Sequence, residues 1–239
     1  MACVICPAAF SQDNFPRIET FFGYSLMKVG KYVCMENNYN CGRTMLEIHN
    51  EDSNIDESNL LKKGISASLV YNFTPVIGLE AFFLRNYGNF SFNRSTWSPM
   101  PTNNTTESKV KIDRTEMAFL AGPRFTYRNI SDKVTPFFHA LAGPGRHGGS
   151  FEEIYYEGPG RDAYFDYKSH TSFGFALGGG LDIPVNDHVA IRAVQADYYM
   201  AIHDKYMNDS NNPYASSYPE KKLFNNLNLS FGVVFRFGR

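Results

Sequence analysis

His170 and Ser172 are the two residues whose types and spacing most directly suggest covalent chemistry. A histidine base beside a serine hydroxyl is the arrangement that activates serine for ester cleavage. No carboxylate in the nearby sequence obviously orients His170, which weakens this interpretation. The segment Gly143-x-Gly145-x-x-Gly148 matches a dinucleotide-binding fingerprint, but that fingerprint requires a helix after it, and a glycine-rich aromatic segment follows instead. We therefore expect no cofactor.

Two further segments could bind a cation or form a crosslink. The acid-rich segment 51–57 lacks the glycine of an EF-hand loop, so a solvated loop is expected there. Cys34 and Cys41 lie close together in a polar segment, where a metal site would need more ligands. In an exported protein such a pair predicts a disulfide that closes a short loop, and two free thiols are the alternative.

The N-terminus is typical of a signal for export. Residues 2–10 are short and apolar, and Ala9-Phe10-Ser11 matches the small-x-small rule for signal-peptidase cleavage. A basic n-region is missing, so the signal would begin upstream of Met1; a frayed N-terminus is the alternative. We expect residues 1–11 to be a signal-peptide remnant, removed with Cys3 and Cys6, and residues 12–239 to form one domain.

Composition leaves two classes of protein open. Aromatic residues make up 15% of the chain and charged residues 20%, and no apolar run approaches the roughly 18 residues of a spanning helix. The chain is therefore either soluble or crosses a membrane as strands. The net charge of −1 gives no electrostatic reason to expect binding to nucleic acid.

Alternating hydrophobicity predicts about eight antiparallel strands. It is clearest in residues 226–237, where one face is apolar and the other mainly polar or small, over a length that can cross a bilayer at a tilt. Similar alternation occurs in residues 17–26, 64–73, 77–83, 114–127, 133–143, 172–183 and 188–200. A change of phase near Val194 predicts a β-bulge that places Gln195 on the polar face. Pro123, inside a strand, predicts another bulge or a strand end.

The connections between these strands alternate in length. Short turns are expected at residues 74–75, 129–132 and 184–187, and long polar segments at about 29–61, 86–110, 145–170 and 201–222. An even number of strands with alternating short and long connections is typical of an up-and-down transmembrane β-barrel with short periplasmic turns and long external loops.

Charged residues of both signs fall on the polar faces of the strands. In a soluble barrel this face would be the core, and burying such charges there would be costly. In a membrane barrel it lines the lumen, where opposite charges can pair, and eight strands leave a lumen that side chains can fill. The predicted interior polar network, which would plug the lumen, consists of Arg17, Glu19, Glu80, Arg114, Glu116, Arg124, His139, Asp182, Arg192, Asp197 and Arg236.

Several segments resemble the outer-membrane β-barrel family that includes OmpA-type transmembrane domains and opacity-type porin-like proteins. They are YNFTPVIGLEAFF (71–83), GPRFTYRN (122–129), VTPFFHALAG (134–143), FALGGGLDIPVNDHVAIRAVQADYY (175–199) and NNLNLSFGVVFRFG (225–238). The resemblance implies a monomeric, multi-pass protein of the bacterial outer membrane after Sec-type export. Its implied partners are lipopolysaccharide, phospholipid and the barrel-assembly machinery. The aromatic terminus typical of the family is modified here, since Gly238 and Arg239 follow Phe237.

These motifs are architectural, so we expect a structural or surface-interaction protein and not an enzyme, with loops that contact the environment, a host or phage. A narrow porin-like channel for small solutes is the alternative. A second alternative is a lipid A deacylase-like hydrolase, because some eight-stranded barrels of that type carry a similar His-x-Ser pair. Here Phe173 replaces the usual asparagine, and the alternation turns Ser172 toward the lumen, whereas that family's site faces lipid.

Overall fold

The computed structural model describes residues 15–34, 61–97, 105–128, 133–157, 163–203 and 222–238. These residues form eight strands, which confirms the predicted number. The strands are β1 (Ile18–Cys34), β2 (Leu61–Asn72), β3 (Ile77–Trp97), β4 (Thr105–Thr126), β5 (Thr135–Glu157), β6 (Ala163–Pro184), β7 (Val189–His203) and β8 (Lys222–Phe237).

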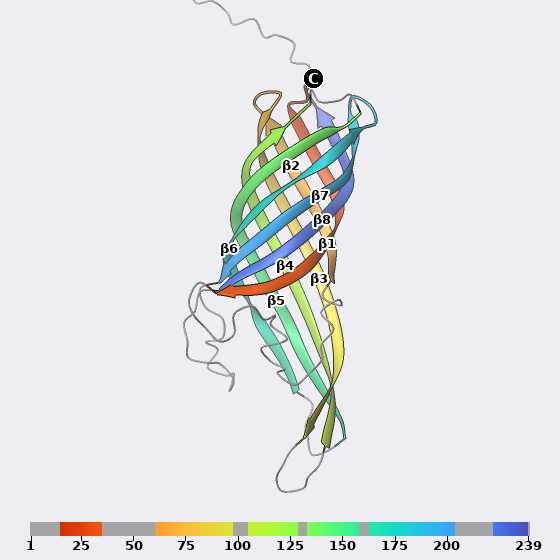
Figure 1. Cartoon of the computed structure of the whole chain (residues 1–239), viewed down its shortest axis with the longest axis vertical. Coiled ribbons are helices and arrows are strands. Elements are labelled where there is room, and N and C mark those ends of the chain that lie inside the picture. The colour runs from red at the N-terminus through yellow and green to blue at the C-terminus, as the bar shows by residue number, and fades with distance from the viewer. Residues whose placement is uncertain are drawn as a thin grey trace, which may run out of the picture.

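The strands form one closed antiparallel barrel, as the sequence predicts. Each strand pairs with its neighbours in sequence, and β1 also pairs with β8. Figure 1 shows the strands strongly tilted relative to the long axis, as closure into a barrel requires. Within the described ranges no helix is long and apolar enough to span a membrane.

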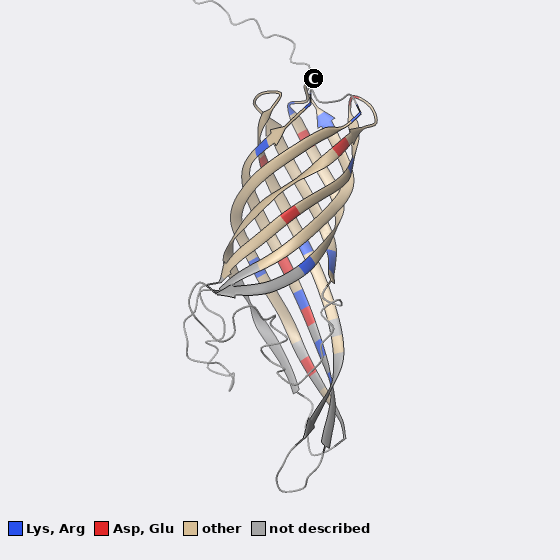
Figure 2. Ribbon diagram, viewed as in Figure 1, with Lys and Arg blue, Asp and Glu red and all other residues tan. Residues whose placement is uncertain are grey.

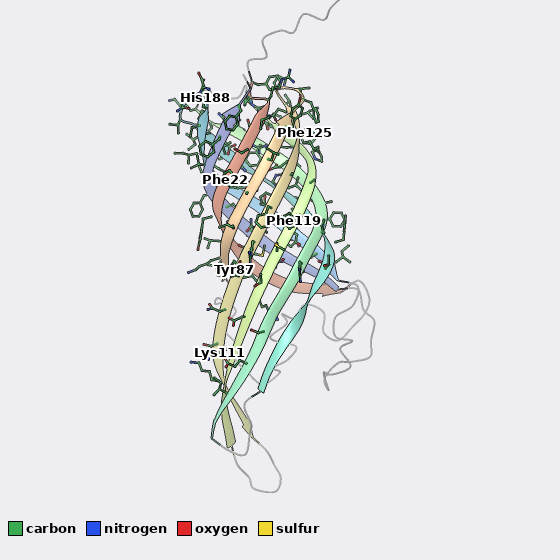
Figure 3. All side chains as sticks on the ribbon, turned by 180° about the vertical axis from the view of Figure 1, so that it is seen from behind. Phe22, Tyr87, Lys111, Phe119, Phe125 and His188 are labelled. Atoms are coloured by element: carbon green, nitrogen blue, oxygen red, sulfur yellow. The ribbon has the colours of Figure 1, made fainter. Side chains whose placement is uncertain are left out.

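Side chains alternate between the outside and the inside of the barrel, except at a bulge in β7. Along β8, Leu227 and Phe231 are 45% and 48% exposed, whereas Asn228 and Ser230 are completely buried. The same arrangement recurs around the wall, where Phe22 and Phe119 project outward (Figure 3). Apolar residues thus cover the outside and polar residues line the inside, which is the reverse of a protein that buries an apolar core in water.

Polar side chains hold the two short turns that the structure describes. The hydroxyl oxygen of Thr74 accepts a hydrogen bond from the N–H of Ile77 at 2.8 Å, and the carbonyl oxygen of the Asn186 side chain accepts one from the N–H of Val189 at 2.8 Å. These turns lie at the same end of the barrel as the C-terminus (Figure 1). We call this the short-turn end and the opposite end the loop end.

Two of the predicted long loops are wrong. β3 continues to Trp97 and β4 begins at Thr105, while β5 continues to Glu157 and β6 begins at Ala163. These strands stay paired beyond the rim of the barrel at the loop end (Figure 1): β3 and β4 keep an unbroken register, and β5 and β6 shift register once, between His147 and Gly149. Charged residues are frequent on this extension (Figure 2). Both faces of a sheet can be polar where both meet water, so alternation is lost there although backbone pairing continues. The glycines at 143–148 lie within β5, so no helix follows them.

Of the two irregularities predicted within strands, the structure confirms one and contradicts the other. The bulge near Val194 is confirmed, since the pairing of β7 with β8 shifts between Arg192 and Gln195. The bulge or strand end expected at Pro123 is wrong. Pro123 pairs with Leu79 in an unbroken register between β3 and β4, and pairing with β5 resumes at Arg124 without a shift. The missing N–H therefore interrupts the ladder locally without bending or ending the strand.

Candidate functional site: the barrel lumen

A buried ionic cluster fills the lumen toward the short-turn end. We use this name for Glu19, Glu80, Arg124, His139, Asp182, Arg192 and Asp197, which are at most 1% exposed. Arg124 is its centre, with guanidinium nitrogens 3.2 Å from Asp182, 3.6 Å from Glu19 and 3.7 Å from Glu80. Six strands, β1 and β3 to β7, supply the side chains of the cluster, so it joins opposite walls of the barrel.

Arg192 binds Asp182 through two parallel contacts. Its Nε and Nη2 donate to the two carboxylate oxygens at 2.8 and 3.1 Å, and its Nη1 donates to the Gln195 side chain at 2.6 Å. The guanidiniums of Arg124 and Arg192 also lie over the ring of Phe137, at 3.8 and 4.3 Å from its centroid. Bidentate geometry and stacking on an aromatic face are the features that favour arginine over lysine in such places.

His139 bridges two carboxylates across the lumen. Its Nδ1 lies 2.8 Å from Oε2 of Glu80 and its Nε2 lies 2.9 Å from Oδ1 of Asp197. Ionised carboxylates only accept hydrogen bonds, so an imidazolium that donates from both ring nitrogens satisfies both contacts. A positive His139 would then be one more cation among the carboxylates of the cluster.

An apolar layer lies above the ionic cluster, toward the loop end. Inward positions along β4 run from Arg124 through Gly122 to Leu120 and Ala118, and only then reach Glu116. The layer consists of Met27, Phe82, Leu84, Ala118, Leu120, Leu141, Ala176, Tyr199 and Ala201, all buried. Apolar side chains therefore separate the ionic cluster from Glu116 along β4. On another side of the lumen, Asn228 lies 3.4 Å from Asp197 and 3.5 Å from Asn86, so polar side chains continue past the apolar layer there.

A second set of polar side chains, which we call the outer cluster, lies on the loop-end side of this layer. It consists of Lys62, Glu116, His147, Ser172 and Asn226. Glu116 connects them: its carboxylate lies 2.8 Å from the Lys62 ammonium, 3.2 Å from the Asn226 side-chain nitrogen and 3.5 Å from Nδ1 of His147. The other ring nitrogen of His147, Nε2, lies 3.1 Å from the hydroxyl oxygen of Ser172.

The predicted interior residues therefore occupy three places. The ionic cluster brings together seven of them, with Arg236 at its edge, where the Nε of Arg236 is 3.9 Å from Glu19. Arg17 lies at the short-turn end and donates to the carbonyl of Phe73 at 3.3 Å. Glu116 belongs to the outer cluster, and Arg114, partly buried, is one inward position further toward the loop end.

No pattern in the sequence pointed to a role for Lys62, His147 or Arg128. Arg128 donates to Glu19 at 2.7 Å and so closes the ionic cluster at the short-turn end. Ser172 faces the lumen as the alternation predicts, and it is 8% exposed. Its histidine contact is His147 on the neighbouring strand. The side chain of His170 lies outside the described residues, as do the side chain of Cys34, all of Cys41, the acidic segment 51–57 and the expected signal remnant.

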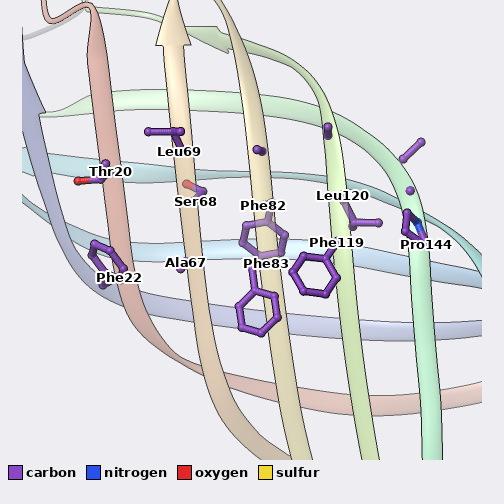
Figure 4. Close-up of a pocket in the computed structure, with 14 residues that line it drawn as sticks. Thr20, Phe22, Ala67, Ser68, Leu69, Phe82, Phe83, Phe119, Leu120 and Pro144 are labelled. Atoms are coloured by element: carbon purple, nitrogen blue, oxygen red, sulfur yellow. The ribbon is translucent and has the colours of Figure 1, made fainter. Parts of the chain in front are cut away.

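The outer wall carries a shallow apolar groove of about 620 Å³. Figure 4 shows Phe22, Leu69, Phe83 and Phe119 around it, and small alanine side chains form its floor. The groove runs across neighbouring strands of the wall from β1 to β5. Within the described residues, no group of three or more potential metal ligands is close enough together to hold an ion.

A barrel with an apolar outside and a charged, side-chain-filled inside defines a protein that crosses a membrane as strands. The sequence matches the outer membrane protein beta-barrel domain over residues 4–237, so the chain belongs to this family and is an outer-membrane protein. No curated protein is similar to it in sequence.

Solved structures of comparable topology include Ail, the attachment invasion locus protein of Yersinia pestis. One Ail structure shares 15% identity over 92% of this chain and 99% of Ail, with a TM-score of 0.44. Another Ail structure, in complex with the heparin analogue sucrose octasulfate, shares 16% identity over 91% of this chain and 97% of Ail, with a TM-score of 0.42. Neisserial surface protein A shares 15% identity over 92% of this chain and 97% of that chain, with a TM-score of 0.42.

Proposed function

We propose that this protein is a surface-interaction barrel whose lumen is closed to solutes. The observation that supports closure most directly is the succession of two side-chain layers across the lumen. The ionic cluster joins opposite walls. Above it, the apolar layer and a hydrogen-bonded row of buried polar side chains, Asn228, Asn86 and Ser25, together occupy the lumen. Side chains that pack and hydrogen-bond to one another inside an eight-stranded barrel leave little space for water or ions, so this arrangement favours a plug over a pore.

Conductance of the purified protein in a planar bilayer tests closure. A plugged lumen predicts no stable ion current at moderate voltage. A reproducible single-channel current that requires the folded protein would instead support the alternative, a narrow porin-like channel for small solutes.

The surface role is supported by the sheet that β3 to β6 extend beyond the rim at the loop end (Figure 1). This extension carries charged side chains in water, among them the exposed pair of Lys111 and Glu152, whose charged atoms are 3.0 Å apart. Residues on a rigid scaffold outside the membrane are well placed to contact other molecules. We propose that the outer wall, including its groove, contacts the acyl chains of lipopolysaccharide and phospholipid, and that the barrel-assembly machinery inserts the chain.

Labelling of intact cells tests which end faces outward. An amine-reactive polymer too large to pass the outer membrane should modify Lys111 on the extension. Lys133, exposed at the short-turn end, is the matched control and should react only after lysis. Modification of Lys133 but not Lys111 in intact cells would contradict a surface role for the extension.

A further inference from the structure

We propose that the outer cluster is a site for hydrolysis of acyl esters, with Ser172 as nucleophile and His147 as base. This goes beyond the proposed surface role and would revise the expectation that the chain is not an enzyme. The geometry carries the proposal. Nε2 of His147 is 3.1 Å from the Ser172 hydroxyl oxygen, and Nδ1 faces the carboxylate of Glu116 at 3.5 Å. A serine, a base and a group that orients the base define an activated nucleophile.

Glu116 is itself held in place. One carboxylate oxygen contacts the Lys62 ammonium at 2.8 Å, and the other accepts from Asn226 at 3.2 Å and faces His147. Glu116 is 1% exposed. A fixed, buried carboxylate beside Nδ1 favours the tautomer in which Nδ1 carries the proton, so that Nε2 is free to accept the proton of Ser172. We assign Glu116 as a positioning residue.

Tyr199 supplies a donor for the oxyanion. Its hydroxyl oxygen is buried and has no hydrogen-bond partner among the described residues, which is unusual for a native structure. A methyl group built on Gly145 would clash with this oxygen and lie 3.5 Å from both Nε2 of His147 and Oγ of Ser172. The Tyr199 hydroxyl, Nε2 of His147 and Oγ of Ser172 therefore converge on Gly145. Gly145 is the cross-strand partner of Ser172.

The reaction that this arrangement supports is simple acyl transfer to water. Oγ of Ser172 bonds to the acyl carbon as its proton passes to Nε2 of His147. The ester C–O bond breaks, and His147 returns the proton to the leaving alcohol. Water then attacks the acyl-serine in the same way and releases the acid. Tyr199 belongs to both the site and the apolar layer, so an alkyl acyl group would be directed toward Ala118, Ala176 and Ala201.

A fluorophosphonate probe tests the nucleophile directly, because its phosphorus forms a bond to an activated serine oxygen and releases fluoride. The folded full chain in detergent should be labelled at Ser172, as mapped by peptide mass spectrometry. Ser172→Ala should lose the label, and Ser66→Ala, a change at a second buried lumen serine, should keep it. Heat-modifiable migration on a gel shows that each variant is folded.

Turnover of p-nitrophenyl butyrate separates a reactive site from a structural hydrogen bond. Ser172→Ala should reduce hydrolysis to the rate without protein. Tyr199→Phe, which removes only the hydroxyl, should lower kcat about 100-fold. Glu116→Gln should lower kcat and leave KM unchanged. An unlabelled Ser172, or turnover that Ser172→Ala does not change, would overturn the proposal. Neither result bears on closure of the lumen, which the conductance measurement tests separately.

Discussion

Replacing Arg124 with methionine is expected to lower the free energy of unfolding by about 3–5 kcal/mol. The guanidinium is completely buried, and its nitrogens lie 3.2 Å from Asp182, 3.6 Å from Glu19 and 3.7 Å from Glu80. Methionine has a similar length but no charge, so three buried carboxylates would lose a shared partner without creating a large cavity. Loss of the contact with Phe137, at 3.8 Å, adds to the effect.

Urea unfolding of the protein in detergent, followed by the heat-modifiable shift on a gel, measures this change. The matched control is Lys111→Met, which removes the cation of an exposed pair in which both side chains are more than 40% exposed. An exposed pair contributes at most about 1 kcal/mol, so the control should unfold close to the wild type. Adding Glu80→Gln to Arg124→Met should restore part of the loss. If Arg124→Met costs no more than the control, the ionic cluster does not stabilise the fold as argued.

Three further substitutions test other parts of the barrel by the same unfolding measurement. Phe119→Lys places a charge on the lipid-facing wall and should cost about 2–4 kcal/mol; wild-type stability would mean that this position is not in the bilayer. Gly178→Val would drive a side chain into the Asp197 carboxylate and should cost about 1–3 kcal/mol, whereas an unchanged midpoint would contradict the close approach. Combining Arg124→Met with Glu116→Gln should be additive within about 0.5 kcal/mol, because eight residues of β4 separate them by about 26 Å; a larger coupling would mean that the two clusters are energetically connected.

The side of the barrel that each residue faces could be predicted because the period of a strand is two. Inward Arg192 and Asp197 follow from counting along β7 once the bulge at Val194 is included. Which inward residues contact one another could not be predicted, because this depends on the stagger between strands. Glu116 and Arg124 lie on the same face of β4, yet they belong to different clusters.

The contact of Ser172 with His147 was also missed, for two reasons. The sequence draws attention to His170, two residues from Ser172, but the contact of Ser172 comes from the neighbouring strand, 25 residues away. Counting inward positions in steps of two from His139 does reach His147, so its direction was available from the sequence. The obstacle was the expected loop at 145–170, since a strand that leaves the bilayer no longer needs an apolar face and its alternation disappears.

From the order of layers in the lumen, we propose that closure and stability rest on different residues. The ionic cluster holds opposite walls together through paired charges, and such a pairing is sensitive to the loss of one partner. In the proposed plug, the side chains of the apolar layer narrow the lumen by packing against one another, and this packing does not need any ion pair. Loss of Arg124 should therefore weaken the barrel without opening a path for ions. Conversely, changes in the outer cluster, on the far side of the apolar layer, can alter chemistry at the loop end while the barrel remains closed.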